Sequence, residues 1–261
     1  FIQCKPSQPP AAGKILGAGY DHSSDSLFVR VTDKAKIQVK TQRDMLRLVH
    51  SVFDPLGMCS PYVLKGRMFY QMANSAKLGW DTELPQEILE PFAKWQSTID
   101  NLKDLKLPRW YSTPEFKDAK NELAIFSDAS SEGYGCVAYL RQYIPDTDKV
   151  HVAYLFSKSH VVPTNMHKSP LPDQEDHLDS IPRLELNAAR LAAMVRDLLI
   201  RECGIEFQRI YMFSDSITVL NWICDLDRKF KTFENFRVKK IRCLTNVADW
   251  RHVPSLDNPA D

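Results

Sequence analysis

The sequence predicts an α/β protein in which a mainly helical first part precedes a second part built from a sheet and flanking helices. Two apolar runs, residues 123–128 and 210–215, both end in Phe-Ser-Asp, which is typical of buried strands whose ends meet solvent. Apolar residues at helical spacing dominate residues 41–102, whereas runs rich in Val, Tyr and Ala begin near residue 122. We therefore expect two domains, residues 1–110 and 118–261.

The composition is that of a globular protein. With 44% hydrophobic and 26% charged residues over 261 positions, the chain can bury two modest cores, and its net charge is only +1. No apolar run approaches the roughly 20 residues of a membrane span and no signal peptide opens the chain, so we expect no membrane association. Six scattered cysteines without a CxxC pair suit reduced thiols inside the cell and argue against a zinc knuckle. Because the chain begins at Phe1 without Met, we expect a processed product or a fragment.

The first part is expected to open with a strand pair followed by a helix. Strand-like residues from Leu16 to Val31 alternate around a turn at Asp21-His22-Ser23-Ser24. Thr41 and Asp44 form a capping-box pattern that predicts a helix start. That helix should end at the turn signal of residues 53–57.

Further helices complete this part. Pro61 is expected to open one helix, and an apolar stripe from Leu84 to Leu102 predicts another, with a kink or a break at Pro91. Gly17-Ala18-Gly19 lacks the GxGxxG spacing of a nucleotide site. We therefore expect a helical packing unit without a catalytic site, and then a linker that includes Leu107-Pro108-Arg109.

Three strands should open the second part, at residues 123–127, about 134–142 and 150–157. A polar, Pro-rich segment follows at residues 163–181, and its acids and histidines imitate a metal site. Because this segment has no apolar frame to fix ligand geometry, a mobile surface loop is the favoured interpretation.

Helices and one more strand alternate after this loop. Ser180 or Asp179 should cap a helix opened by Pro182, whose core residues step by 4, 3, 4 and 3: Leu184, Ala188, Leu191, Val195 and Leu198. Residues 216–225 predict a further helix, and residues 247–253 predict a last strand.

The two strand-end aspartates, Asp128 and Asp215, would lie at one edge of the sheet if their strands are neighbours. Like charges at such a distance repel unless a cation lies between them. Glu185 lies in the first turn of a helix that can flank this edge, although a surface glutamate that complements the helix dipole is the alternative. The pattern therefore points to a divalent-metal site.

A basic stretch covers residues 228–242, where seven cations face only Glu234: Arg228, Lys229, Lys231, Arg237, Lys239, Lys240 and Arg242. Phe230, Phe233 and Phe236 are interspersed among them. One interpretation is an amphipathic helix with a solvated basic face. The other is a binding surface for a phosphate backbone, with an affinity that falls as salt rises.

Short motifs along nearly the whole chain carry a family resemblance. They are Phe53-Asp54-Pro55-Leu56-Gly57, Trp80-Asp81, Leu107-Pro108-Arg109, Phe126-Ser127-Asp128-Ala129-Ser130, Ile181-Pro182-Arg183-Leu184-Glu185-Leu186, Ser214-Asp215-Ser216, Trp250-Arg251-His252-Val253-Pro254 and Asn258-Pro259-Ala260-Asp261. Together they resemble the Pol polyprotein of BEL/Pao-type LTR retrotransposons. The order strand-Asp128, helix-Glu185, strand-Asp215 and terminal Asp261 resembles a ribonuclease H domain.

The resemblance implies a domain plan. Residues 1–110 would be the end of the reverse transcriptase palm with thumb- and connection-like helices. Residues 118–261 would be an RNase H-like domain with a mixed five-stranded sheet, flanking helices and a truncated C-terminal helix. Because the family's Tyr-x-Asp-Asp polymerase motif is absent, we expect no polymerase activity from this chain.

The resemblance also implies a metal-dependent endonuclease that hydrolyses the RNA strand of RNA:DNA hybrids. Two Mg²⁺ ions, for which Mn²⁺ can substitute, would be bridged by Asp128, with Glu185 and Asp215 on one side and Asp261 on the other. Candidate nucleic-acid contacts are Ser130, Arg183, Arg237, Lys239 and Lys240. The implied partners are an RNA:DNA hybrid and the remainder of the polyprotein, namely the palm and fingers polymerase domain and the integrase. The implied location is a cytoplasmic particle, the nucleus or both.

Two departures from the family bear on activity. Many RNase H domains carry a histidine in a flexible loop before the last aspartate, whereas His252 is expected to belong to a strand, so turnover should be slow. The sequence ends at Asp261, so the fourth carboxylate should be poorly held and the activity of the fragment weak.

Two other classes of function stay open at this point. An aspartic peptidase is suggested by Asp128-Ala129-Ser130 and Asp215-Ser216-Ile217, but both lack the glycine of the Asp-Thr-Gly motif. That reading also gives Glu185 and Asp261 no role. The other class is a non-catalytic fragment of the polyprotein that only binds a primer–template.

Overall fold

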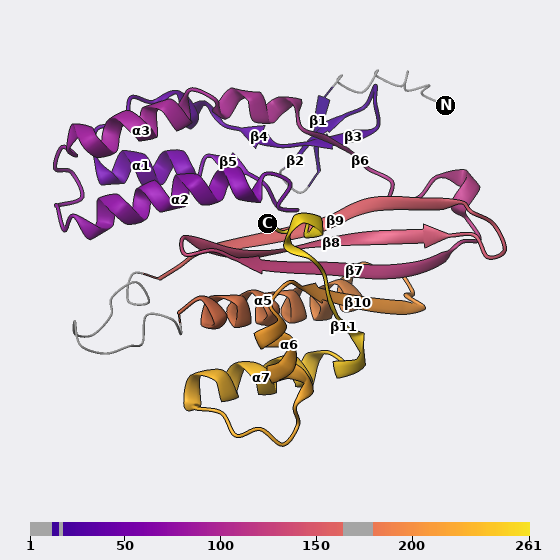
Figure 1. Cartoon of the computed structure of the whole chain (residues 1–261). Helices are drawn as coiled ribbons and strands as arrows, with labels where there is room; N and C mark the ends of the chain where they lie inside the picture. The colour runs from indigo at the N-terminus through magenta and orange to yellow at the C-terminus, as the bar shows by residue number, and fades with distance from the viewer. Residues whose placement is uncertain (1–11, 16–17, 164–179) are drawn as a thin grey trace, which may run out of the picture. The chain divides into compact units, whose positions relative to one another are not determined.

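The structure, a computed structural model, describes residues 12–15, 18–163 and 180–261. The chain divides into two units, Phe1–Trp110 and Tyr111–Asp261, and each is described by itself (Figure 1). Among the described helices, none is long and apolar enough to cross a membrane.

A four-stranded antiparallel sheet opens the first unit, in the order β1-β2-β3-β6: β1 (Ala12–Ile15), β2 (Ala18–Asp21), β3 (Ser26–Phe28) and β6 (Lys106–Pro108). The expected strand pair is present as β2 and β3. The linker expected at Leu107-Pro108-Arg109 is wrong, because these residues continue the sheet. Arg109 then donates two hydrogen bonds to the Asp25 carboxylate, at 2.7 and 3.0 Å. This ion pair and the β3–β6 pairing together hold the segment to the first unit.

The helices of the first unit begin where the sequence predicts. They are α1 (Gln42–Val49), α2 (Ser60–Ser75) and α3 (Gln86–Gln96), accompanied by the 3-10 turns η1 (Asp33–Lys36) and η2 (Ile99–Asp104) and by the short pair β4 (Arg30–Val31) and β5 (Val52–Phe53). The capping box of Thr41 and Asp44 is confirmed, and Pro61 lies in the first turn of α2. The first helix is shorter than predicted, because β5 follows it before the turn at residues 54–57.

Of the two alternatives expected at Pro91, a kink or two helices, the two helices are wrong, because α3 runs through this residue. Pro91 is exposed, so the ring costs the helix one backbone hydrogen bond on its solvent side only. Phe92 and Trp95 in the same helix are buried in the core and fix the helix there. The helix ends later, at Gln96, and η2 begins at Ile99.

The second unit is built on a mixed five-stranded sheet in the order β11-β10-β7-β8-β9. Its strands are β7 (Lys120–Ala129), β8 (Gly133–Tyr143), β9 (Val150–Val161), β10 (Arg209–Ser214) and β11 (Trp250–His252). The meander β7-β8-β9 is antiparallel, whereas β10 is parallel to β7 and β11 is parallel to β10. The predicted fold class, an RNase H-like mixed five-stranded sheet with flanking helices after a mainly helical region, is confirmed.

The register of β7 and β10 places the two Phe-Ser-Asp sequences side by side. Phe126 pairs with Phe213 and Ser127 with Ser214, and the two phenyl rings stack with centroids 4.6 Å apart. The Ser127 hydroxyl also donates to the Phe213 carbonyl at 3.1 Å. Because parallel strands end at the same edge of a sheet, the residues that follow these serines meet there.

Helices α5 (Ser180–Glu202), α6 (Ile217–Cys224) and α7 (Thr232–Leu244) lie on one side of this sheet (Figure 1). Helix α5 contacts β7, β8 and α7. The core between them contains fully buried apolar side chains, among them Leu123, Ile125, Leu140, Leu186 and Met212. Short 3-10 turns complete the unit: η3 (Pro114–Phe116), η5 (Val247–Asp249) and η6 (Ser255–Asp257).

Three expectations about these elements need correction. Helix α5 already includes Ser180, so Ser180 is not its cap; Asp179 and the polar loop after residue 163 lie outside the described residues. Leu198 is 38% exposed, and Leu199 takes its place in the core because α5 is flanked by both the sheet and α7, which shifts and widens its buried arc. The last strand is only three residues long, since residues 247–249 form η5 instead.

Candidate metal centre

Three acidic side chains from three different elements converge at the edge where β7 and β10 end. Asp128 is the second-last residue of β7, Asp215 directly follows β10, and Glu185 comes from the second turn of α5. One carboxylate oxygen of each lies within 4.8 Å of those of the other two. This is the group that sequence reasoning brought together.

The electrostatics of this cluster are unfavourable without a counter-charge. Glu185 Oε2 and Asp215 Oδ1 are buried and have no hydrogen-bond partner among the described residues. Burial, followed by the charges of Asp215 and Asp128, raises the pKa of Glu185 to about 8. Burial and then the charge of Asp215 also raise the pKa of Asp128, with Asp261 adding to the effect. Buried oxygens without partners among like charges fit a hard divalent cation, which takes carboxylate oxygens as ligands.

The Asp215 carboxylate is oriented by a serine that the sequence did not predict to belong to the site. The Ser255 hydroxyl donates to Asp215 Oδ2 at 2.7 Å, which leaves Oδ1 facing the cluster without a partner. Ser255 reaches this position because the chain stays beside β10 after β11 has ended. The Val253 amide there donates to the Ser214 carbonyl at 3.1 Å. His252 lies in β11 opposite Ser214, in a strand as expected. The available signal for Ser255 in the sequence was its position shortly after the predicted last strand, residues 247–253.

Asp261 lies near this edge but outside the three-carboxylate group. It is exposed, and its charge is close enough to contribute to the raised pKa of Asp128. Asn258, which sequence reasoning did not assign to the site, is buried and donates from Nδ2 to the Ser127 carbonyl at 3.2 Å. The Asp261 amide in turn donates to the Asn258 carbonyl at 3.1 Å. The terminal residues are thus tied to the end of β7.

Ser130 was expected to contact nucleic acid, and the structure gives it a local partner. Its hydroxyl accepts from the amides of Glu132 and Gly133, both at 3.2 Å, and so closes the turn between β7 and β8. Its side chain is still exposed beside the carboxylates.

The four basic residues expected to contact nucleic acid divide into two arginines with internal partners and two exposed lysines. Arg183 donates to Glu234 Oε1 at 2.9 Å. Arg237 donates to Asn187 and to the Phe233 carbonyl, with its guanidinium 3.3 Å from the centroid of the Phe233 ring. Burial, followed by the charge of Arg190, lowers the pKa of Arg237. In contrast, Lys239 and Lys240 are exposed on α7.

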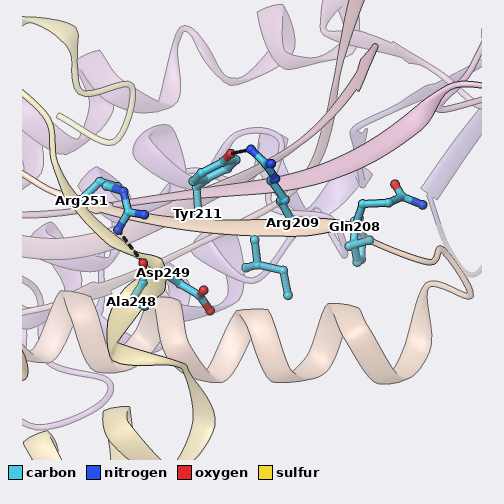
Figure 2. A pocket seen from close by; sticks show the side chains of 8 residues that line it. Gln208, Arg209, Tyr211, Ala248, Asp249 and Arg251 are labelled. Atoms are coloured by element: carbon cyan, nitrogen blue, oxygen red, sulfur yellow. Dashed lines mark hydrogen bonds between the residues drawn. The ribbon is translucent and has the colours of Figure 1, made fainter. Parts of the chain in front are cut away.

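A separate pocket of about 410 Å³ lies at the other end of β10 (Figure 2). In Figure 2, Arg209 donates to the Tyr211 hydroxyl and Arg251 to the Ala248 carbonyl, while Asp249 lies beside them. Arg209 opens the strand that Asp215 follows, so the two are roughly 20 Å apart at about 3.3 Å per residue. This pocket is therefore not part of the carboxylate cluster.

A comparison with protein families matches residues 41–216 to the Pao retrotransposon-like RNaseH-like domain. The matched range contains all three clustered carboxylates, whereas α7, β11 and Asp261 lie beyond it. None of the curated proteins matched the chain in a sequence comparison.

Solved structures that resemble the chain include RNase H1 from the archaeon Halobacterium salinarum NRC-1, at 12% identity and a TM-score of 0.32 over 54% of this chain and 90% of that one. LC11-RNase H1 in complex with an RNA/DNA hybrid matches at 12% identity and a TM-score of 0.31, over 54% and 89%. The N-terminal RNase H domain of a Mycobacterium tuberculosis protein, fused to maltose-binding protein, matches at 12% identity and 0.30, over 53% and 86%. The family match spans more than half of the residues of this chain. The chain therefore belongs to the Pao retrotransposon-like RNaseH-like domain family.

Proposed function

We propose that this chain is a metal-dependent endonuclease that hydrolyses the RNA strand of RNA:DNA hybrids, as the RNase H part of a retrotransposon reverse transcriptase. The observation that supports this most is the cluster of Asp128, Glu185 and Asp215, in which two buried carboxylate oxygens have no hydrogen-bond partner in the part of the chain that the structure describes. Three converging acids destabilise the folded state unless a cation compensates their charge, so this arrangement favours a metal-binding role.

The proposed roles follow from the positions of the side chains. Asp128, Glu185 and Asp215 would hold divalent metal, with Asp261 as a fourth ligand at the open side. When bound, Mg²⁺ supplies an activated water and stabilises the charge that develops on the phosphate and the leaving oxygen. Ser255 keeps the Asp215 carboxylate oriented, and Glu185 has to release its proton before it can act as a ligand.

The substrate would be attracted by the exposed lysines of α7. Lys239 and Lys240 are the proposed phosphate contacts, while Arg183 and Arg237 shape this surface through their bonds to Glu234 and Asn187. Selectivity for the RNA strand would come from contacts to its 2′-hydroxyl groups across the minor groove. The first unit is proposed to be the end of the palm with thumb- and connection-like helices, which joins this domain to the rest of the polyprotein.

The test is cleavage of a labelled RNA:DNA hybrid by the purified chain in Mg²⁺ or Mn²⁺. Asp128→Asn and EDTA should each abolish cleavage. Asp146→Asn is the matched control, because Asp146 is exposed in the β8–β9 turn with a φ of 61°, a conformation that Asn also adopts. Binding of the hybrid without cleavage would instead favour a primer–template-binding fragment. Proteolysis that pepstatin inhibits would favour an aspartic peptidase.

A further inference from the structure

A second pocket, of about 260 Å³, lies in the second unit beside α6 and the loop that enters α7. Its lining includes Trp222 from α6, the loop residues Arg228, Lys229, Phe230 and Lys231, and Glu234 from the first turn of α7. None of the three clustered carboxylates belongs to it. It is smaller than the roughly 300–1,000 Å³ of pockets for drug-sized ligands, so it suits one ring system.

Glu234 lines this pocket with a buried carboxylate. The residue is 7% exposed, and its Oε1 accepts from Arg183 Nε at 2.9 Å. Its second oxygen, Oε2, is buried and has no hydrogen-bond partner among the described residues. Buried carboxylate oxygens are almost always bonded, because leaving one without a donor costs free energy. The unused acceptor therefore points to a ligand that brings an N–H group.

The other walls of the pocket suit a flat, anionic ligand. The rings of Trp222 and Phe230 lie 6.3 Å apart and nearly perpendicular, and the Arg228 guanidinium is 5.9 and 5.6 Å from their centroids. Planar aromatic and guanidinium groups are the surfaces on which unpaired bases stack. Lys229 and Lys231 are exposed beside them and can reach a phosphate attached to the same ligand.

We propose that this pocket binds one unpaired nucleobase of a single-stranded segment next to the hybrid. The base stacks against the aromatic and guanidinium groups and donates an amino hydrogen to Glu234 Oε2, while its phosphate lies near Lys229 and Lys231. The proposal rests on the proposed function and adds a base-selective subsite to it. A phosphate alone brings no N–H group, so it would leave Glu234 Oε2 without a donor.

The carboxylate acceptor predicts which bases are favoured. Cytosine and adenine present an exocyclic amino group, as in the pairing of Glu or Asp with cytosine N4. Thymine and uracil offer a single imino N–H between two carbonyl oxygens, and these oxygens would face the carboxylate. We therefore expect amino-bearing bases to bind more tightly than thymine or uracil.

The test measures binding of fluorescent oligo-dC, oligo-dA and oligo-dT of equal length to the full chain, in EDTA at fixed salt. Oligo-dC and oligo-dA should bind at least about threefold more tightly than oligo-dT. Glu234→Gln should bring the three affinities within about twofold of each other, because an amide also donates to the thymine carbonyls. Ribose 5-phosphate should not compete with oligo-dC, whereas cytidine monophosphate should.

Matched variants separate this reading from a general loss of affinity. Glu206→Gln removes an exposed carboxylate outside the pocket and should keep the wild-type base preference. Trp222→Leu and Phe230→Leu keep an apolar side chain but remove the ring, and each should weaken all three oligonucleotides. Thermal melts identify any variant that does not fold, and the wild-type comparison of bases stands without the variants.

Equal affinities of the wild-type chain for the three oligonucleotides would overturn the proposal. A preference that persists in Glu234→Gln, or competition by ribose 5-phosphate equal to that by the nucleotide, would also overturn it. Cleavage of a hybrid in Mg²⁺ is scored separately. A chain that cleaves hybrids but shows no base preference refutes the subsite alone, and a base preference without cleavage refutes the nuclease alone.

Discussion

At the scale of single residues, Glu185 links the carboxylate cluster to the pH dependence of stability. Its pKa rises from 4.5 to about 8 on folding, because burial and two neighbouring carboxylates disfavour its charged form. Between these values the unfolded chain has released this proton while the folded chain keeps it. Raising the pH from about 5 to 8 therefore lowers the free energy of unfolding of the metal-free chain.

Thermal unfolding in EDTA across this pH range measures the effect, and we expect Tm to fall by at least roughly 2–4 °C. Glu185→Gln should flatten the profile and raise Tm at pH 8. Mg²⁺ should stabilise the wild-type chain more at pH 8 than at pH 6, because the metal binds the ionised carboxylates. A profile that Glu185→Gln leaves unchanged would contradict the assignment, and Glu206→Gln is the control for loss of a carboxylate.

Ser255 carries a second prediction at this scale. Its hydrogen bond of 2.7 Å orients Asp215, so Ser255→Ala should raise the Mg²⁺ concentration for half-maximal hybrid cleavage by about tenfold. Because Ser255 is exposed, its loss should change Tm little. Titration of cleavage with Mg²⁺ measures the shift, with Ser97→Ala, an exposed serine of the first unit, as control. An unchanged Mg²⁺ dependence would show that Asp215 needs no such support.

The sequence predicted the acids of the site better than their supports. Asp128 and Asp215 follow the same local motif, and two parallel strands bring equal motifs to one edge. The partners of Ser255 and Asn258 lie 40 and 131 residues away along the chain. These contacts depend on the path of the chain after β11, which brings Ser255 and Asn258 back to the edge of the sheet. No local pattern in the sequence predicts that path.

At the scale of elements, helix α7 combines an arginine that stabilises the fold with lysines that are exposed. Arg242 donates to the carbonyls of Trp222, Ile223 and Asp225 at 2.9, 3.0 and 2.7 Å, and so caps the C-terminal end of α6. Lys239 and Lys240 are exposed on the same helix. The spacing of charges along the sequence did not distinguish the stabilising arginine from the exposed lysines, because Arg242 lies within one helical turn of Lys239 and Lys240.

Substitutions should therefore act differently along α7. Arg242→Gln should lower the free energy of unfolding by about 1–3 kcal/mol, since it leaves carbonyls without their charged donor. Lys239→Ala with Lys240→Ala should leave Tm nearly unchanged and reduce the slope of log affinity for a hybrid against log salt by about 2. Chemical denaturation and binding titrations at several salt concentrations measure the two effects. The interpretation fails if the double variant keeps the wild-type salt slope.

Errors in predicting elements arose where tertiary contacts override local signals. Pro91 is a strong local breaker, yet burial of Phe92 and Trp95 keeps α3 continuous. Leu107-Pro108-Arg109 looks like a linker by composition, but β3 pairs with Lys106–Pro108 and the Asp25 carboxylate accepts hydrogen bonds from Arg109. In both places the deciding partner lies elsewhere in the unit, so a window of neighbouring residues does not contain it.

At the scale of the whole molecule, the two units have separate hydrophobic cores that share no residue. The core of the first unit includes Met45, Leu48 and Phe92, and that of the second includes Leu123 and Leu186. Residues 111–261 are long enough to bury a core of their own. We therefore expect the second unit, produced as residues 111–261, to fold cooperatively and to gain stability from Mg²⁺.

The end of the first unit offers the matched comparison. A fragment of residues 1–110 keeps β6 and the Arg109–Asp25 ion pair, whereas residues 1–105 lose both. Loss of the edge strand should lower the free energy of unfolding by about 1–2 kcal/mol, and a lower midpoint of urea unfolding measures this loss. The exposed ion pair should add little to it. Near-equal urea midpoints for the two fragments would indicate that residues 106–110 act as a linker and do not stabilise the first unit. Failure of residues 111–261 to unfold cooperatively would show instead that the two cores depend on each other.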